Sequence, residues 1–141
     1  MFDSVSASAA SGLAAAVHRA EASASNIANI DSRGALPGGE AANVSAPADV
    51  REAYVPVRVE QSSAGESGGT VTNERPVRPS YVPVADPGAS YANEDGLAAA
   101  PNVDVAEEVI EQIEAQNAFA ASTRTIESVQ QMVRALYDLP E

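Results

Sequence analysis

Cysteine, tryptophan and lysine are missing from this 141-residue chain, and only 4% of its residues are aromatic. Without cysteine there is no disulfide framework, no thiolate metal site and no cysteine nucleophile. Apolar residues make up 45% of the chain, but alanine supplies much of this fraction. A compact core built from so few large side chains would therefore be thin.

The chain also has little positive charge, and its formal net charge is -12. This excess of acidic residues argues against nucleic acid and anionic lipid surfaces as partners. No apolar run approaches the length of a membrane span, so we expect no membrane insertion. The N-terminus lacks a basic region followed by an uninterrupted apolar run, so we expect no cleaved signal peptide.

The last third of the chain, residues 102–139, has the pattern of one long amphipathic helix. Asp104 stands at the N-cap position, and Glu107 follows three residues later as in a capping box. Such a helix would be roughly 50 Å long and needs a partner along its whole length. Apolar and small residues recur at steps of three or four along one face: Val105, Val109, Ile113, Ala120, Thr123, Ile126, Val129, Val133 and Leu136.

Residues 3–30 form a second helical pattern, with a period close to 3.5 residues. Its stripe is mostly alanine, so a partner helix can approach closely but little apolar area is buried per turn. We expect this helix to become ordered only against the C-terminal helix and neighbouring chains. The stripe consists of Phe2, Ser6, Ala9, Leu13, Ala16, Ala20, Ala24 and Ile27.

The middle of the chain is rich in glycine and proline and shows little helical periodicity. Alternating valines predict a half-buried strand over residues 53–60, and Pro56 makes it an edge strand. Residues 70–74 are expected to form the return strand of a small hairpin. Repeated prolines predict an extended, polyproline-like path over residues 77–89, followed by a turn region at 90–100.

Together these patterns predict a mainly α chain. Its two long terminal helices would form an antiparallel coiled-coil-like pair, because the middle is too small to return the chain otherwise. An extended middle segment would contain the small β-hairpin. The predicted segments are the N-terminal helix, a linker, the extended middle and the C-terminal helix, at residues 1–30, 31–52, 53–100 and 101–141.

No arrangement of residues predicts catalysis, a cofactor site or a metal site. His18 is the only histidine, and no spacing suggests a nucleophile or second ligand beside it. Glu107, Glu111 and Glu114 share a helix face where a cation site is conceivable. Acidic residues also favour a helix N-terminus through the helix dipole, which is the simpler interpretation.

Two short segments each allow two interpretations. Residues 25–29 place Asn26 and Asn29 around Ile27, which fits either a helix C-terminus or a fixed contact with a neighbouring chain. Residues 101–105 fit either an N-terminal cap with a hydrophobic staple or an assembly contact.

Motifs at both ends resemble those of the flagellar axial proteins, the rod and hook components. Ala10-Ser11-Gly12-Leu13, then Arg19, then Ser25-Asn26-Ile27-Ala28-Asn29 is similar to the family's N-terminal motif. Pro101-Asn102-Val103-Asp104 and the segment from Ala115 to Ala121 are similar to its C-terminal helix start and the segment that follows.

The resemblance is greatest to the small proximal rod subunits, with departures that fit a divergent paralogue. Asn117 stands where the family usually has arginine, Phe119 where it has tyrosine and Ser122 where it has asparagine.

The resemblance implies a structural subunit of the bacterial flagellar basal-body rod, not an enzyme. Its terminal helices would build a helical tube that transmits torque in the periplasmic rod. Its partners would be copies of itself, other rod and axial subunits, and the flagellar export apparatus, which would export it without a cleaved signal. The alternative is a soluble acidic helical adaptor or export chaperone; a metal-binding or enzymatic module at the Glu107 cluster is a third possibility.

We expect the assembly interface to lie on the two helical stripes and the motif asparagines. Its predicted residues are Leu13, Ala16, Ala20, Asn26, Ile27, Asn29, Asn102, Ile113, Phe119, Ala120, Ile126, Val129, Val133 and Leu136.

Overall fold

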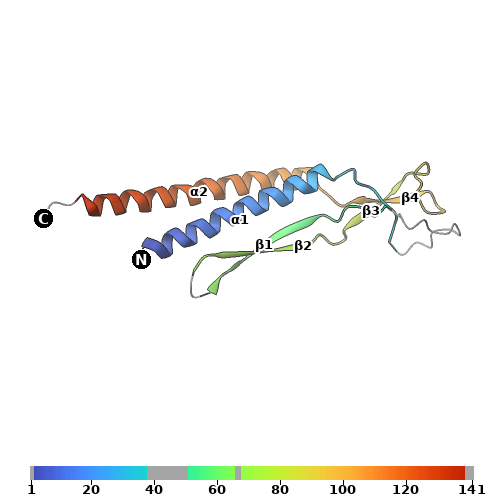
Figure 1. Cartoon of the computed structure of the whole chain (residues 1–141). Helices are drawn as coiled ribbons and strands as arrows, with labels where there is room; N and C mark the ends of the chain where they lie inside the picture. Colours follow the sequence, from blue (N-terminus) through green and yellow to red (C-terminus); the bar gives the residue numbers. More distant parts are fainter. Residues whose placement is uncertain (1, 38–50, 66–67, 139–141) are drawn as a thin grey trace.

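The computed structural model describes residues 2–37, 51–65 and 68–138, and it shows an elongated molecule (Figure 1). Two long helices lie side by side and run in opposite directions. The predicted linker at residues 31–52 lies largely outside the described residues. The elements in chain order are α1 (Phe2–Ala28), β1 (Val57–Ser63), β2 (Thr70–Pro76), β3 (Tyr81–Ala85), β4 (Leu97–Pro101) and α2 (Val105–Tyr137).

The prediction of a mainly α chain with a coiled-coil-like helix pair is wrong. Within the described residues, four strands form two separate antiparallel sheets, β1–β2 and β3–β4. The β1–β2 hairpin lies along α1, so α1 contacts both a helix and a sheet (Figure 1). The backbone of the middle segment pairs with itself and gives α1 a second partner. The fold combines helices and sheets.

The ends of both helices are fixed by short polar side chains. The Asn29 side-chain amide donates to the Ser25 carbonyl at 2.9 Å, and the Asn29 backbone N–H donates to the same carbonyl at 3.1 Å, so Asn29 holds the end of α1 through two bonds. Asp104 is confirmed as the N-cap of α2: its carboxylate accepts from the Ala106 N–H at 2.8 Å and the Glu107 N–H at 3.3 Å. The Glu107 side chain pairs with Arg58, so it does not complete the predicted capping box.

The β1–β2 hairpin pairs from Val57 opposite Pro76 to Ser63 opposite Thr70. The observed strand β1 starts at Val57, later than the strand predicted over residues 53–60. Pro56, directly before it, is buried. At the hairpin turn, Gly69 has a φ of +97°, and an added Cβ would lie 2.7 Å from Ser11 Oγ. The next residue, Thr70, donates its N–H to the same Oγ at 3.0 Å. Glycine thus lets the turn approach α1 closely.

The second sheet corrects the predicted polyproline-like path and turn region. Tyr81 pairs with Pro101 and Pro83 with Ala99, so both predicted stretches contribute a strand. In a two-stranded sheet each strand has a free edge, which is why a proline is tolerated there. Gly34 adds a bridge to this sheet, exchanging two backbone hydrogen bonds with Ala99 at 3.0 and 2.9 Å.

The described core is thin and built mainly from alanine. Val59 and Val129 are the large aliphatic side chains buried in the described part of the chain. Asn26 is the largest fully buried side chain, with 1% of its surface exposed. Close backbone approach between small residues thus replaces the interdigitation of large ones. The other buried apolar residues are Ala9, Ala15, Ala16, Ala22, Ala98, Ala99 and Ala115.

Candidate assembly surfaces

The two helices meet along a narrow seam of small side chains. Ala16 on α1 and Ala115 on α2 are each 1% exposed, and Val129 is 5% exposed. A Cβ added to Gly12 would lie 3.1 Å from Ser122 Oγ, so the backbones are close at this level. The alanine-rich stripe of α1 thus allows close packing, but it leaves large apolar residues of α2 outside the seam.

Asn26 joins three elements at one end of this seam. Its amide nitrogen donates to the Val57 carbonyl at 2.8 Å and to Glu108 Oε1 at 2.7 Å. Its oxygen accepts from the Val57 N–H and the Tyr54 hydroxyl, each at 3.0 Å. Both donors and both acceptor sites are used, so the amide has no hydrogen-bonding capacity left for a second chain. Asn26 therefore fixes the start of β1 against α1 and α2.

Ser23 and Glu108 also hold this end of the seam, and the sequence did not single them out. Ser23, 1% exposed, donates its hydroxyl to the Glu108 carbonyl at 2.8 Å. Ser23 lies seven residues after Ala16 on α1, and this heptad spacing was the signal that it continues the seam.

Arg19 pairs with two of the acidic residues on α2. Its Nε lies 2.5 Å from Glu111 Oε1 and its second terminal nitrogen lies 2.9 Å from Glu114 Oε2. The hydrogen bond from Arg19 holds the pKa of the Glu111 carboxyl below its ordinary value, and the same bond raises the pKa of Arg19. Within residues 2–37, 51–65 and 68–138, no three His, Asp or Glu side chains are grouped so as to hold a metal ion. The acidic helix face pairs instead with arginines.

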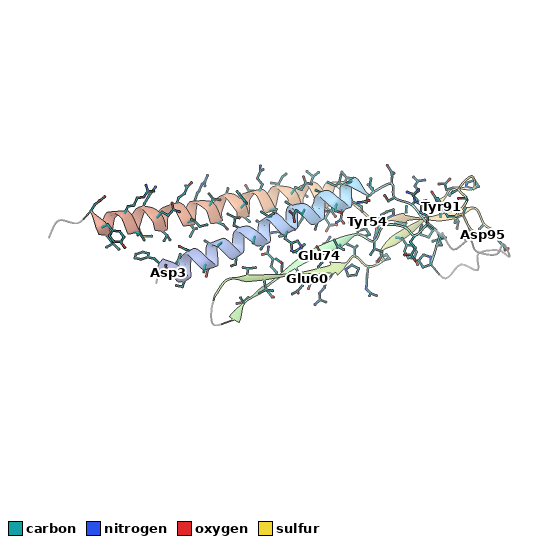
Figure 2. The ribbon with its side chains drawn as sticks, viewed as in Figure 1. Asp3, Tyr54, Glu60, Glu74, Tyr91 and Asp95 are labelled. Atoms are coloured by element: carbon teal, nitrogen blue, oxygen red, sulfur yellow. The ribbon has the colours of Figure 1, made fainter. Side chains whose placement is uncertain are left out.

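His18 ties the hairpin to α1. Its Nδ1 lies 3.0 Å from Thr72 Oγ1, and its Nε2 lies 2.8 Å from Glu74 Oε1. Figure 2 shows Glu74 on the hairpin, beside α1. With the bonds of Asn26 and Ser11, these contacts follow the hairpin along much of α1. The hairpin covers one side of the helix pair through polar contacts.

The other side of the helix pair is open. A groove of about 570 Å³ runs between α1 and α2 there. Its apolar lining is incompletely covered: Ile113 is 53% exposed, Phe119 42% and Val17 38%. Exposed apolar residues gathered in one place, unlike scattered ones, mark a contact site. Residues along the groove include Val17, Ala20, Val109, Ile113, Gln116 and Phe119.

The predicted interface residues fall into three groups in this structure. Those at the seam or with its heptad spacing are buried or half-buried: Leu13, Ala16, Ala20, Ile27, Ala120, Ile126, Val129 and Val133. The asparagines are used within the chain, Asn26 and Asn29 as above and Asn102 through a 2.9 Å bond to the Pro79 carbonyl. Ile113, Phe119 and Leu136 are exposed. That these residues meet other subunits stays a prediction.

None of the helices in the described part of the chain combines the length and apolar character needed to cross a bilayer.

Residues 95–139 match the family model described as flagellar basal body rod FlgEFG protein C-terminal. The match includes all of β4 and all of α2. It confirms the resemblance to the flagellar rod and hook family, and it supports a structural role in the flagellar basal body. A search of curated proteins gives no match. The particular rod subunit that is most similar stays a prediction.

Proposed function

We propose that this chain is a structural subunit of the flagellar basal-body rod, which assembles through its two terminal helices into a helical tube that transmits torque. The match over residues 95–139 supports this, because it falls on α2, one of the two helices that would form the tube. The partners are copies of the chain and other axial subunits.

The observation that carries the proposal is the asymmetry of the helix pair. The hairpin covers one side, while the groove on the other side exposes Val17, Val109 and Ile113. Complete burial of a large aliphatic side chain gives roughly 1.5–3 kcal/mol, and these side chains, 38–53% exposed, forgo about half of that each. A neighbouring subunit that covers the groove recovers this free energy.

Torque transmission needs a subunit whose parts move together. The bonds of Asn26, Arg19 and His18 connect α1 to α2 and to the hairpin at three levels. A load applied to one helix is therefore shared by the other elements. When copies meet through different surfaces and the contact does not close into a ring, a helical filament results.

The proposed location is the periplasmic rod, reached through the flagellar export apparatus without cleavage of a signal. An elongated subunit with an alanine-rich core suits passage through a narrow channel, because little tertiary structure has to be undone and remade.

Fractionation of flagellated cells tests the proposal. The full chain, carrying an epitope tag in the exposed loop near Gly88, is followed in purified basal bodies and in the soluble pool. Recovery in basal bodies, and absence of completed rods when the gene is deleted, are the expected results. Recovery only in the soluble pool, with normal basal bodies in the deletion strain, would contradict the rod role and favour an adaptor or chaperone.

A further inference from the structure

We propose that the β1–β2 hairpin of one copy binds the acidic turn Glu94–Asp95 of a second copy. The receiving surface is the arginine patch, formed by Arg58, Arg75 and Arg78. This inference rests on the proposed function, since it assumes that copies of the chain assemble. It goes further by naming both surfaces of a contact between the β parts of the molecule, outside the helix pair.

The arginine patch lines a pocket of about 490 Å³ on the hairpin. Arg58 and Arg75 stand directly opposite each other in the two strands, so their side chains share one face of the sheet. Like charges in this position destabilise a sheet. Both side chains are more than half exposed, so no packing inside the chain requires them there. An arrangement that costs stability and serves no core is typical of a binding surface.

The acidic neighbours of the patch leave part of its charge free. Arg58 pairs with Glu107, and Arg75 pairs with Glu60 at 2.6 Å. A guanidinium has five N–H donors, so each of these arginines keeps donors for a second carboxylate. Arg78 is exposed and has no ion pair among the described residues. Three arginines against two glutamates leave the patch a net charge of +1, on a chain whose total is -12.

The charge of the whole chain limits the kind of partner. A long polyanion, such as a nucleic acid or an anionic lipid surface, would be repelled by the many other acidic residues. A partner that presents one or two carboxylates at one point avoids this repulsion. Arginine suits such a partner, because its planar guanidinium binds a carboxylate through two parallel hydrogen bonds.

The acidic turn has the matching properties. Glu94 and Asp95 are exposed, and neither has an ion pair among the described residues. No basic residue occurs within residues 79–123. The side-chain oxygen of Asn93 accepts from the Asp95 N–H at 3.1 Å and from the first N–H of β4 at 2.8 Å. The turn therefore presents its two carboxylates on a fixed backbone.

A copy cannot place this turn on its own patch. Arg78 precedes β3 (Tyr81–Ala85), and the turn lies beyond the other end of that strand, roughly 13 Å further along at about 3.3 Å per residue. Figure 2 shows Asp95 at the far end of the β3–β4 sheet and Glu60 on the hairpin, well apart. A second copy brings the two surfaces together. Because they differ, the contact can repeat from copy to copy.

The absence of lysine makes a zero-length cross-link specific. Arg78→Lys keeps the positive charge and introduces the only side-chain amine of the chain. A carbodiimide joins this amine to a carboxylate only where the two are in contact. The untagged full chain is treated both purified at high concentration and in isolated basal bodies, and mass spectrometry identifies the linked residues. The expected product is a dimer in which position 78 of one copy is linked to Glu94 or Asp95 of the other.

Two further variants provide the controls. Arg124→Lys places the only side-chain amine at an exposed position of α2, and it should give no link to the acidic turn. Adding Glu94→Gln and Asp95→Asn to Arg78→Lys should lower the dimer yield roughly fivefold or more. An undiminished yield, or a link from position 78 to a different protein of the basal body, would overturn the proposal.

The outcomes separate this contact from the rod role. If the chain is present in basal bodies but position 78 never links to the acidic turn there or in solution, the contact is wrong and the rod role stands. If the chain is absent from basal bodies, the rod role fails. A dimer linked through the acidic turn in the purified chain would then still support the contact.

Discussion

The two sides of the helix pair are built from different interactions. On the covered side, Asn26, Arg19 and His18 make directional bonds to the hairpin and to α2, and each bond has a defined partner. On the open side, Val17, Val109 and Ile113 expose apolar surface that has no directional requirement. The difference indicates which surface specifies the shape of the subunit and which is available to neighbours.

The comparison also shows how a thin core specifies one structure. Alanines pack closely but tolerate sliding, since one small side chain resembles the next. A buried amide that bonds two backbone atoms and a carboxylate in one place does not tolerate a shift. The polar contacts therefore fix the register of α1 against β1 and α2. This register determines which apolar side chains are exposed on the open side.

The largest expected loss of stability comes from a substitution on the covered side. Asn26→Asp removes the donor to the Val57 carbonyl and places a carboxylate against Glu108, whose Oε1 lies 2.7 Å from the amide nitrogen. We expect the free energy of unfolding to fall by roughly 3 kcal/mol, measured by urea denaturation followed by circular dichroism. Asn29→Asp is the control and should cost roughly 1 kcal/mol or less. Equal losses at the two positions would show that Asn26 does not fix the register.

The next largest loss of stability is expected at the seam between α1 and α2. Gly12→Leu would force side-chain atoms toward Ser122, whose Oγ lies 3.1 Å from an ideal Cβ. Overpacking of this kind costs roughly 1–3 kcal/mol. Gly88→Leu is the matched control, because nothing lies within 4 Å of its added Cβ. The two thermal midpoints are compared, and a midpoint for Gly12→Leu as high as that of the control would mean that the helices are not in close contact there.

A smaller effect depends on pH. The hydrogen bond from Arg19 lowers the pKa of Glu111 in the folded chain, so the pair stabilises the fold above the ordinary glutamate pKa. This contribution is lost as the pH falls from roughly 5 through the lowered value. Because the pair is partly exposed, we expect it to contribute no more than about 1 kcal/mol.

Arg19→Gln should reduce stability at pH 7 and flatten the acid side of the stability–pH profile. The measurement is urea denaturation at a series of pH values. If the unfolding free energy of Arg19→Gln fell at low pH as steeply as that of the parent chain, other carboxylates would control unfolding by acid.

The smallest effect on stability is expected on the open side. Ile113→Gln changes a side chain that is 53% exposed, so the unfolding free energy should stay within about 0.5 kcal/mol of the parent. Recovery of the chain in purified basal bodies should nevertheless fall strongly. Ile110→Gln, outside the groove, should be recovered normally. Normal recovery of both variants would mean that the groove is not an assembly surface.

Local signals in the sequence indicated the helices and their ends. Apolar periodicity predicted both helices, and Asp104 marked the start of α2 because a carboxylate at that position can accept from two backbone N–H groups. Motifs at both ends resemble those of the rod and hook family, and the match over residues 95–139 confirms the resemblance for the C-terminal part. These features depend on neighbours within a few residues or on the order of short motifs.

The second sheet and the division of the apolar stripe were missed for physical reasons. The β4 segment Leu-Ala-Ala-Ala-Pro shows no alternation, so nothing in it predicted pairing with β3. On α2, the step of four from Val105 to Val109 and to Ile113 rotates about 40° each time. These residues therefore wind around α2, and all three are about half exposed. The predicted stripe places Ile113 on one face with Val129, but Ile113 lies in the groove and Val129 is buried at the seam.

The sequence by itself determined two long helices with capped ends, a core poor in bulky side chains and a family motif at each end, because these follow from local hydrogen bonding and periodicity. Only the tertiary structure decided that Asn26 is satisfied inside the chain, that the hairpin covers one side of the helix pair and that the other side is open. Those outcomes depend on contacts between residues distant in sequence, whose geometry is fixed only when all the elements pack together.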